Sequence, residues 1–311
     1  NEISFGTYFD IVKTNPDLDL QHIRNELDLL PDESDVRVAT NQLLGDIYGS
    51  LPIVGVQNTS HMLRLLSQQM GSGGRACFDG WVLGYGLGGE VDSDGNAVGL
   101  DNSVDGVAFG VSRWLNESDC KRVGLFGGYG NMSIDTTAPT QSANADHAML
   151  GGFLHSKDGC HYYLLAGAAG YDDLKTSRQI NFGGINRIAR GDFEGNQAAA
   201  YLERGWNLCW GRTRLRLLGS LQYIYLHQEG FTETGAGAAS LTVASLNVHS
   251  LRSSVGGHLD WDYCTTRGNI VSPHVRVAWQ HEYLDTNAVV TSGFGIATAP
   301  TFAGSGLDLG R

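Results

Sequence analysis

Two periodic patterns of apolar residues divide this chain near residue 76. Before that point, apolar residues recur at spacings of three and four, which is the period of an α-helix. After it, apolar residues alternate with glycine and polar residues, which is the period of a β-strand. The first pattern predicts helices over residues 16–30, 35–48 and 56–70. The second predicts nine strands, at about 78–91, 104–115, 119–134, 146–156, 160–173, 195–209, 212–227, 246–264 and 269–285.

The third helix and the first strand follow one another and are predicted to pack together. Large apolar side chains of the strand, Trp81, Leu83 and Tyr85, point one way. The other face of this strand consists of three glycines, namely Gly84, Gly86 and Gly88. A glycine face leaves a thin wall, so we expect the helix at 56–70 to lie against it.

The predicted connections alternate between short and long. Tight turns near 116–119, 157–159, 210–212 and 265–269 alternate with long loops near 92–103, 135–145, 174–194 and 228–245. Aromatic residues lie near both ends of the strands, as in the two belts of a membrane barrel. This arrangement is typical of an outer-membrane β-barrel. A soluble β-sandwich, with its apolar face buried, is the alternative that alternation alone leaves open.

Composition excludes some classes of protein. The 311 residues carry a formal net charge of −12, which argues against a nucleic-acid partner. No run approaches about 18 consecutive apolar residues, which excludes a transmembrane helix but not strands of about ten alternating residues. The chain begins at Asn1 with neither Met nor a signal peptide, so we interpret it as a fragment whose upstream part is missing.

Several segments, taken in order, resemble the translocator β-domain of bacterial autotransporters, the type V secretion family. The resemblance covers most of residues 41–311, and the order and spacing of the motifs carry it. The segments are NQLLGDIYGSL at 41–51, GFTETG at 230–235, SLTVASLNVHSLRSSVGGHL at 240–259 and SPHVRVAWQHEYLD at 272–285.

The resemblance implies an all-β fold, a transmembrane antiparallel up-and-down β-barrel preceded by α-helices, one of which threads the pore. About twelve strands leave room for one helix of roughly 10 Å diameter. Because GLDLGR at 306–311 resembles the stretch before the family's tenth strand, about nine strands are expected here, in an open barrel whose first strand has an unpaired outer edge. The implied domains are the end of the passenger with junction helices at 1–55, the pore helix and linker at 56–75, and the barrel at 76–311.

The implied function is that of a translocator, which anchors and exports an N-terminal passenger to the bacterial cell surface. Expected partners are outer-membrane lipid, the chain's own passenger and the barrel-assembly machinery, with the barrel a monomer and no cofactor or metal. The alternatives are a porin-like pore and an outer-membrane barrel enzyme. An enzyme would need an acid–base cluster at the long-loop rim, and the scattered histidines predict none.

Candidate site residues are those predicted to face the pore. Glu203 in YLERGW matches a pore-facing position of the family. The rest of the set on the strands is Gly84, Gly86, Gly88, Glu90, Gly205, Arg252, His258, Asp260, Arg276 and Glu282, and on the helix Met62, Arg64, Leu65 and Leu66. With Asp262, the carboxylates predict an acidic lumen, and Arg64 is predicted to pair with one of them. The alternative is that these are ordinary polar residues of a pore.

Some autotransporters cut their own chain inside the pore, at a helix Asn beside an acidic side chain. This chain lacks the Asn-Asn pair of that subgroup and offers only Asn58, so we expect no cleavage.

The five cysteines all lie beside predicted short turns. Cys160 and Cys209 begin and end neighbouring antiparallel strands, so a periplasmic disulfide is one interpretation. Unpaired small apolar residues are the other, and the absence of Cys-x-x-Cys spacing argues against zinc. Arg204 is expected on the lipid face beside Trp206, where its cation can reach the interface.

Overall fold

The computed structural model describes most of the chain from residue 17 to residue 306. The described ranges are 17–72, 78–93, 98–116, 120–136, 140–211, 213–261, 263–264, 270–271, 273–285, 288–295 and 301–306. Helices come first in these ranges and strands follow, as the change of period near residue 76 predicts.

The helices are α2 (Leu18–Asp28), α3 (Glu33–Leu43) and α4 (Ile47–Ser72). Asp17 caps α2, because its side chain accepts a hydrogen bond from the backbone N–H of Leu20 at 2.9 Å. No helix in the described part of the chain is long and apolar enough to cross a membrane.

α4 begins at Ile47, so the prediction of a break before residue 56 is wrong. Pro52 and Gly55 both lie inside the helix. Pro52 is in the second turn, where its missing N–H removes one bond close to the helix start. Gly55 lies where the helix approaches the sheet, since a Cβ there would be 3.0 Å from Leu226 and 3.2 Å from Gln197. Gly55 therefore brings α4 close to the sheet and does not end the helix.

Nine strands form one curled antiparallel sheet, and each pairs with the strand before it in the sheet's own order, β1-β2-β3-β4-β5-β6-β7-β10-β13. Their bounds are β1 Phe78–Val91, β2 Leu100–Asn116, β3 Lys121–Thr136, β4 Gln141–Asp158, β5 His161–Phe182, β6 Ile185–Trp210, β7 Thr213–Gln228, β10 Leu246–Trp261 and β13 His274–Glu282. The antiparallel up-and-down fold class is confirmed. Among the described residues, β1 pairs only with β2, so its outer edge is unpaired as predicted.

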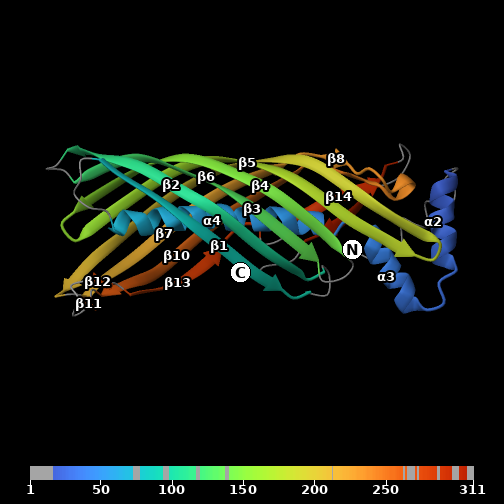
Figure 1. Cartoon of the computed structure of the whole chain (residues 1–311), viewed down its shortest axis with the longest axis horizontal. Coiled ribbons are helices and arrows are strands. Elements are labelled where there is room, and N and C mark those ends of the chain that lie inside the picture. Colours follow the sequence, from blue (N-terminus) through green and yellow to red (C-terminus); the bar gives the residue numbers. More distant parts are fainter. Residues whose placement is uncertain are drawn as a thin grey trace.

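The prediction of long loops at 135–145 and 174–194 is wrong. β5 and β6 stay paired as far as Phe182 and Ile185, and only Gly183 and Gly184 form the turn, with Gly183 at φ +51°. Lys175, Gln179 and Asn181 lie on the exposed face of this hairpin, while the other face is buried and carries the apolar Leu174 and Ile180 together with the polar Thr176 and Arg178. β5 and β6 are therefore longer than the other strands of the sheet, and their hairpin extends beyond the ends of the neighbouring strands (Figure 1).

A second, four-stranded sheet lies at the end of the molecule near α2 and α3 (Figure 1). It contains β15 (Phe302–Ser305), β14 (Val289–Phe294), β9 (Leu241–Val243) and β8 (Phe231–Thr232), with the short helix η1 (Gly237–Ala239) between β8 and β9. At the opposite end, β11 (Tyr263–Cys264) pairs with β12 (Ile270–Val271). The pattern of alternation missed β8, β9, β14 and β15, because strands of two to six residues show too few alternations to recognise.

The convex face of the large sheet carries exposed apolar side chains. Val107, Phe109 and Val111 of β2 are 50%, 44% and 42% exposed and alternate with the buried Ala108. The same holds for residues on other strands, including Leu125, Leu150, Leu165, Leu202 and Leu217. An apolar face of this extent must be covered by a partner or by lipid.

α4 runs along the concave face of the sheet and touches strands from β2 to β7 (Figure 1). On β1, Trp81, Leu83 and Tyr85 pack against the apolar cluster around the helix. Gly84, Gly86, Gly88 and Glu90 lie on the opposite, exposed face, so the prediction that they face the helix is wrong. The physical reason is burial: pointing the large side chains at an apolar helix removes more apolar surface from water than pointing the glycines there.

Candidate functional site

A buried carboxylate joins α4 to the sheet. Glu203 of β6 is fully buried, and its oxygens accept hydrogen bonds from Ser67 of α4 at 2.8 and 2.9 Å. Tyr162 of β5 donates at 2.8 Å, and Tyr201 of β6 donates at 2.5 Å. A carboxylate in this setting needs several donors to offset its lost hydration, and the three hydroxyls provide them. We call these four residues the Glu203 cluster.

A second chain of polar contacts holds α4 at Thr59, about two helical turns before Ser67. Thr59 donates to the Gln197 side-chain oxygen at 2.6 Å, and Gln197 donates to Asp172 at 2.6 Å. The other Asp172 oxygen lies 2.7 Å from Nδ1 of His147. All four side chains are buried. Two separate anchors, at Thr59 and at Ser67, therefore set both the depth and the rotation of the helix.

Apolar packing completes the contact of α4 with the sheet. Met62, Leu65 and Leu66 are buried in the cluster formed by the helix and the strand interior. Met62 lies so close to Gly128 of β3 that a Cβ on that glycine would be 2.0 Å from the Met62 methyl. A side chain at Gly128 would therefore force the Met62 side chain to move and would also come within 2.9 Å of the Val107 carbonyl oxygen.

Asn58 is buried beside these anchors. Its side-chain oxygen accepts a hydrogen bond from the Tyr85 hydroxyl at 3.4 Å. Its amide nitrogen has no partner in the described part of the chain. No carboxylate is hydrogen-bonded to it there, so the geometry includes no acid to activate this Asn.

Arg64 does not pair with a carboxylate among the described residues, so that prediction is wrong. Its guanidinium contacts Nδ1 of His61 one turn earlier. Its electrostatic neighbours are two further cations, Arg252 and Arg276. Arg252 itself pairs with Glu282, Nε to Oε2 at 3.4 Å. The helix cation therefore lies among like charges.

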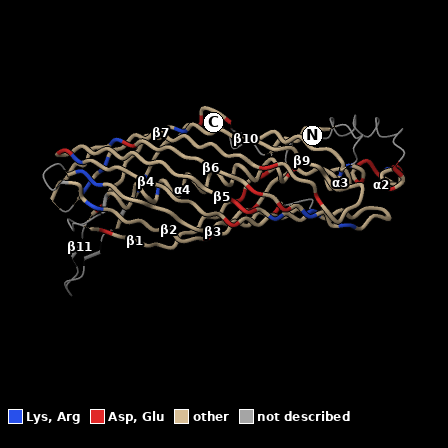
Figure 2. Tube along the Cα trace, turned by 90° about the horizontal axis from the view of Figure 1, so that it is seen from above, with Lys and Arg blue, Asp and Glu red and all other residues tan. Residues whose placement is uncertain are grey.

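The remaining predicted strand residues lie on the concave face. Gly205 is buried beside Tyr162, His258 lies 3.2 Å from Asp260, and Arg276 lines the cavity beside α4. Asp262 lies outside the described residues. The concave face also carries Arg122, Lys157, Arg214 and Arg216, so the predicted acidic character is wrong for the described strands. Figure 2 shows Lys and Arg gathered at the end near β11 and many acidic residues towards α2.

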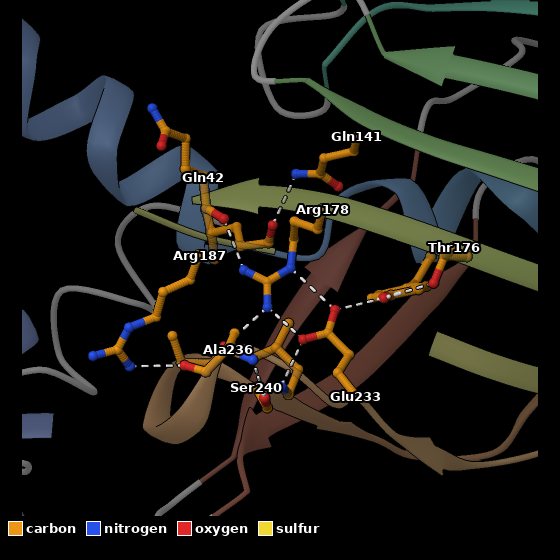
Figure 3. A network of polar contacts seen from close by, with 12 residues as sticks. Gln42, Gln141, Thr176, Arg178, Arg187, Glu233, Ala236 and Ser240 are labelled. Atoms are coloured by element: carbon orange, nitrogen blue, oxygen red, sulfur yellow. Dashed lines mark hydrogen bonds and ion pairs between the residues drawn. The ribbon is translucent and has the colours of Figure 1, made fainter. Parts of the chain in front are cut away.

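A second buried site lies at the end of the molecule near α3 (Figure 3). Arg178 of β5 and Glu233, between β8 and η1, are both fully buried and form an ion pair. Tyr48 of α4 donates to Glu233 at 2.6 Å and also lies 3.1 Å from the Thr176 hydroxyl. We call these four residues the Arg178–Glu233 cluster.

Backbone groups from three further segments complete this cluster. Arg178 donates to the carbonyl oxygens of Gln42 at 2.7 Å and Ala239 at 2.9 Å, and Glu233 accepts from the N–H of Leu241 at 2.7 Å. A single ion pair therefore joins α3, the start of α4, the long β5–β6 hairpin and the β8–β9 connection (Figure 3).

α2 is held to the same hairpin by a more exposed pair. Arg187 of β6 contacts Asp19 at 2.5 and 2.7 Å, and Glu26 accepts from the N–H of Gly184 at 2.6 Å. The Arg187 guanidinium, as a hydrogen-bond donor, holds the pKa of Asp19 below its usual value of about 4. The pair is partly exposed, so its contribution to stability is small.

We expect an NMR titration of the Asp19 carboxyl carbon to show a midpoint below about 4, returning to about 4 in Arg187→Gln. Because the folded-state pKa is lowered, the pair stabilises the docking of α2 above pH 4. This contribution disappears as pH falls through the folded-state pKa. An unshifted midpoint in the unmodified protein would show that the pair does not form in solution.

The structure leaves Cys160 and Cys209 as free, exposed thiols, so the disulfide interpretation is wrong. The register explains this: the carbonyl of Cys160 accepts from the N–H of Asn207, which places Cys209 two residues further along its strand. Cys77 lies outside the described residues. Arg204 lies over the rings of Tyr163 and Trp206, at 5.2 and 5.3 Å, as expected of a cation at the edge of the apolar band.

Maleimide is therefore expected to label Cys160 and Cys209 in the folded protein without a reductant. Cys160→Ser and Cys209→Ser should each remove one labelled site, as read by peptide mass spectrometry. Labelling at either site that appears only after reduction would contradict the free thiols.

Sequence reasoning missed Tyr48, Arg178 and the α2 pair. Glu233 was visible within GFTETG, but its partner Arg178 lay in a segment predicted to be a loop. Arg178 can be recognised as a buried charge only once this segment is known to be a β-hairpin with one face buried.

Comparisons with known proteins agree with this fold. Residues 80–311 match the family model described as "Autotransporter beta-domain". The chain is similar in structure to the translocator domain of the autotransporter NalP from Neisseria meningitidis, at 16% identity and a TM-score of 0.61, over 84% of this chain and 98% of that one. It also resembles the β-domain of the Bordetella autotransporter BrkA, at 18% identity and a TM-score of 0.49, over 74% of this chain and 96% of that one. A comparison with curated protein sequences gives no match.

Proposed function

This chain belongs to the autotransporter β-domain family, and from that premise we propose that α4 occupies the lumen of its barrel and holds the exported passenger to it. Domains of this family reside in the bacterial outer membrane and act as translocators, not as enzymes. The exposed apolar convex face fits such a location, since lipid would cover it.

The observation that carries the proposal is the Glu203 cluster. A fully buried carboxylate on the inner wall shares the single hydroxyl hydrogen of Ser67, whose oxygen lies 2.8 and 2.9 Å from the two carboxylate oxygens. Arg216 of β7 donates to the Ser67 carbonyl at 3.5 Å. Burying a charge costs several kcal/mol unless donors surround it. The burial of Glu203 is therefore favourable only when α4 lies against the wall, because an empty lumen would remove the hydrogen bond from Ser67.

The finer assignments follow from this placement. We propose that Met62, Arg64, Leu65 and Leu66 face the pore wall, and that Glu203, Gly205, Arg252, His258, Asp260, Arg276 and Glu282 line the lumen. We propose that residues 1–55 are the end of the passenger with its junction helices, that residues 56–75 are the pore helix and linker, and that residues 76–311 belong to the barrel. Outer-membrane lipid and the barrel-assembly machinery are the proposed partners of a monomeric barrel, and α4 stays uncut at Asn58.

Surface proteolysis tests export. Cells expressing the chain with its natural flanking sequence and an epitope tag upstream should release the tag when protease is added outside. A tag that stays protected until the outer membrane is permeabilised would contradict the proposal and favour a porin-like pore.

A further inference from the structure

One arginine lies on the outward, lipid-facing side of the β5–β6–β7 wall. Arg204 of β6 is exposed, and its guanidinium lies over the rings of Tyr163 and Trp206, at 5.2 and 5.3 Å from the ring centroids. His161 packs edge-on against Trp206, with the ring centroids 5.5 Å apart, and so limits the movement of that ring. The two rings hold the cation at one place on the wall without taking up its N–H donors.

The wall on both sides of Arg204 is formed by described strands. Arg204 lies directly opposite Tyr163 of β5 and Gly219 of β7. Among the described residues, none forms an ion pair or a hydrogen bond with its guanidinium. From this level to the short-turn end, the outward-facing described positions of β5, β6 and β7 carry no Asp or Glu. The charge of Arg204 is therefore not balanced on this part of the wall.

The surface beside Arg204 is open on the β7 side. A Cβ added at Gly219 would have one neighbour within 4 Å, the carbonyl oxygen of Ser254 at 3.9 Å. Leu217 and Leu221, the next outward-facing residues along β7, are 42% and 46% exposed. Apolar side chains thus border the opening at both ends, and an acyl chain fits such a surface.

The nearest turn indicates the membrane depth of Arg204. Its partner Tyr163 is the third residue of β5, which follows the short β4–β5 turn at Gly159 and Cys160. Short turns of outer-membrane barrels face the periplasm. Arg204 therefore lies near the headgroups of the periplasmic leaflet, where a long cationic side chain can reach a lipid phosphate.

The surroundings favour an anionic headgroup over a zwitterionic one. A guanidinium binds phosphate oxygens through two parallel N–H donors, and the opposite charges strengthen these hydrogen bonds. The ammonium of a zwitterionic headgroup would lie beside Arg204, with no carboxylate on this part of the described wall to pair with it. An anionic headgroup without an ammonium brings no such repulsion.

We propose that Arg204 binds the phosphate of an anionic phospholipid in the periplasmic leaflet, with one acyl chain of that lipid lying over Gly219. Tyr163 and Trp206 position the guanidinium, and Leu217 and Leu221 contact the chain. The proposal rests on the outer-membrane location of the family and is independent of passenger export.

Native mass spectrometry of the folded protein in detergent counts the lipids bound to it. Phosphatidylglycerol and phosphatidylethanolamine with the same acyl chains are the two probes. One phosphatidylglycerol should bind at least about tenfold more tightly than phosphatidylethanolamine, and Arg204→Gln should weaken its binding at least about tenfold, since charge-assisted hydrogen bonds are lost. Arg204→Lys keeps the charge but not the planar pair of donors, so its affinity should fall between those of the unmodified protein and Arg204→Gln.

Two further variants separate charge from shape. Arg113→Gln removes an exposed outer-face arginine of β2 and should leave phosphatidylglycerol binding nearly unchanged. Gly219→Leu fills the opening without changing the charge and should weaken that binding. Unchanged heat-dependent mobility in gel electrophoresis shows that each variant is folded.

Equal affinity for the two lipids, or equal weakening by Arg204→Gln and Arg113→Gln, would overturn the headgroup site. Unchanged binding in Gly219→Leu would overturn the placement of the acyl chain. Neither result bears on export, which surface proteolysis reads separately.

Discussion

Replacing Arg178 with Met is expected to lower the free energy of unfolding by about 3–5 kcal/mol, because Glu233 then becomes a buried carboxylate without a cation. The hydrogen bonds to Gln42 and Ala239 are lost as well, so α3 and the β8–β9 connection should separate from the β5–β6 hairpin. Denaturant unfolding of the protein in lipid vesicles, followed by tryptophan fluorescence, measures the change.

Arg187→Met is the matched control, since it removes the same type of side chain from the same hairpin. Its partner Asp19 is partly exposed, so the loss should be below about 1 kcal/mol. In the double variant Arg178→Met with Glu233→Met, much of the loss should be recovered, because no unpaired charge stays buried. Equal losses in Arg178→Met and Arg187→Met would show that the Arg178–Glu233 cluster is not buried in solution.

Replacing Glu203 with Leu is expected to lower the free energy of unfolding by about 3 kcal/mol or more and to loosen α4. Leu offers no acceptor to Ser67, Tyr162 and Tyr201, and each buried hydroxyl left without a partner costs about 1–3 kcal/mol. Hydrogen exchange of the α4 amides should rise around Ser67 more than around Thr59, which keeps its contact with Gln197.

Glu203→Gln is the control for this prediction, because the amide keeps one acceptor oxygen at nearly the same place. It should cost less than Glu203→Leu and leave exchange in α4 nearly unchanged. If both variants loosen α4 equally, the negative charge and not the acceptor geometry holds the helix. If neither does, the Glu203 cluster does not anchor α4.

The strands could be predicted from the sequence because their alternation is long and regular. The eighth predicted strand shows this, with the alternating Leu251, Val255 and Leu259 found in β10. The direction of a face was harder to predict. In β1, each face carries one carboxylate, Asp79 on the face of Trp81 and Glu90 on the face of Gly84, so polarity does not distinguish the two faces. Burial of the large side chains against the apolar surface of α4 decides which face points at the helix.

Contacts between distant segments could not be predicted from pattern at all. Arg178 and Glu233 are 55 residues apart and meet because β8 turns back over the hairpin. The sequence offers several lumenal carboxylates as partners for Arg64 and does not choose among them. Its neighbours in the structure are Arg252 and Arg276, and their positions follow from the register of β10 with β13. Glu203 was identified because its motif resembles a family position, whereas its donor Ser67 carries no pattern of its own.

The position of α4 inside the wall is the central claim, and a cysteine cross-link in isolated outer membranes tests it most directly. Ser60 of α4 and Gln222 of β7 are hydrogen-bonded at 3.1 Å, so the pair Ser60→Cys with Gln222→Cys should form a disulfide under mild oxidation in a background without other cysteines. The control pair uses Leu221, the neighbouring residue on the exposed face of β7. A bond in the first pair and none in Ser60→Cys with Leu221→Cys is the predicted result. No bond in the first pair, with both thiols open to labelling, would contradict it.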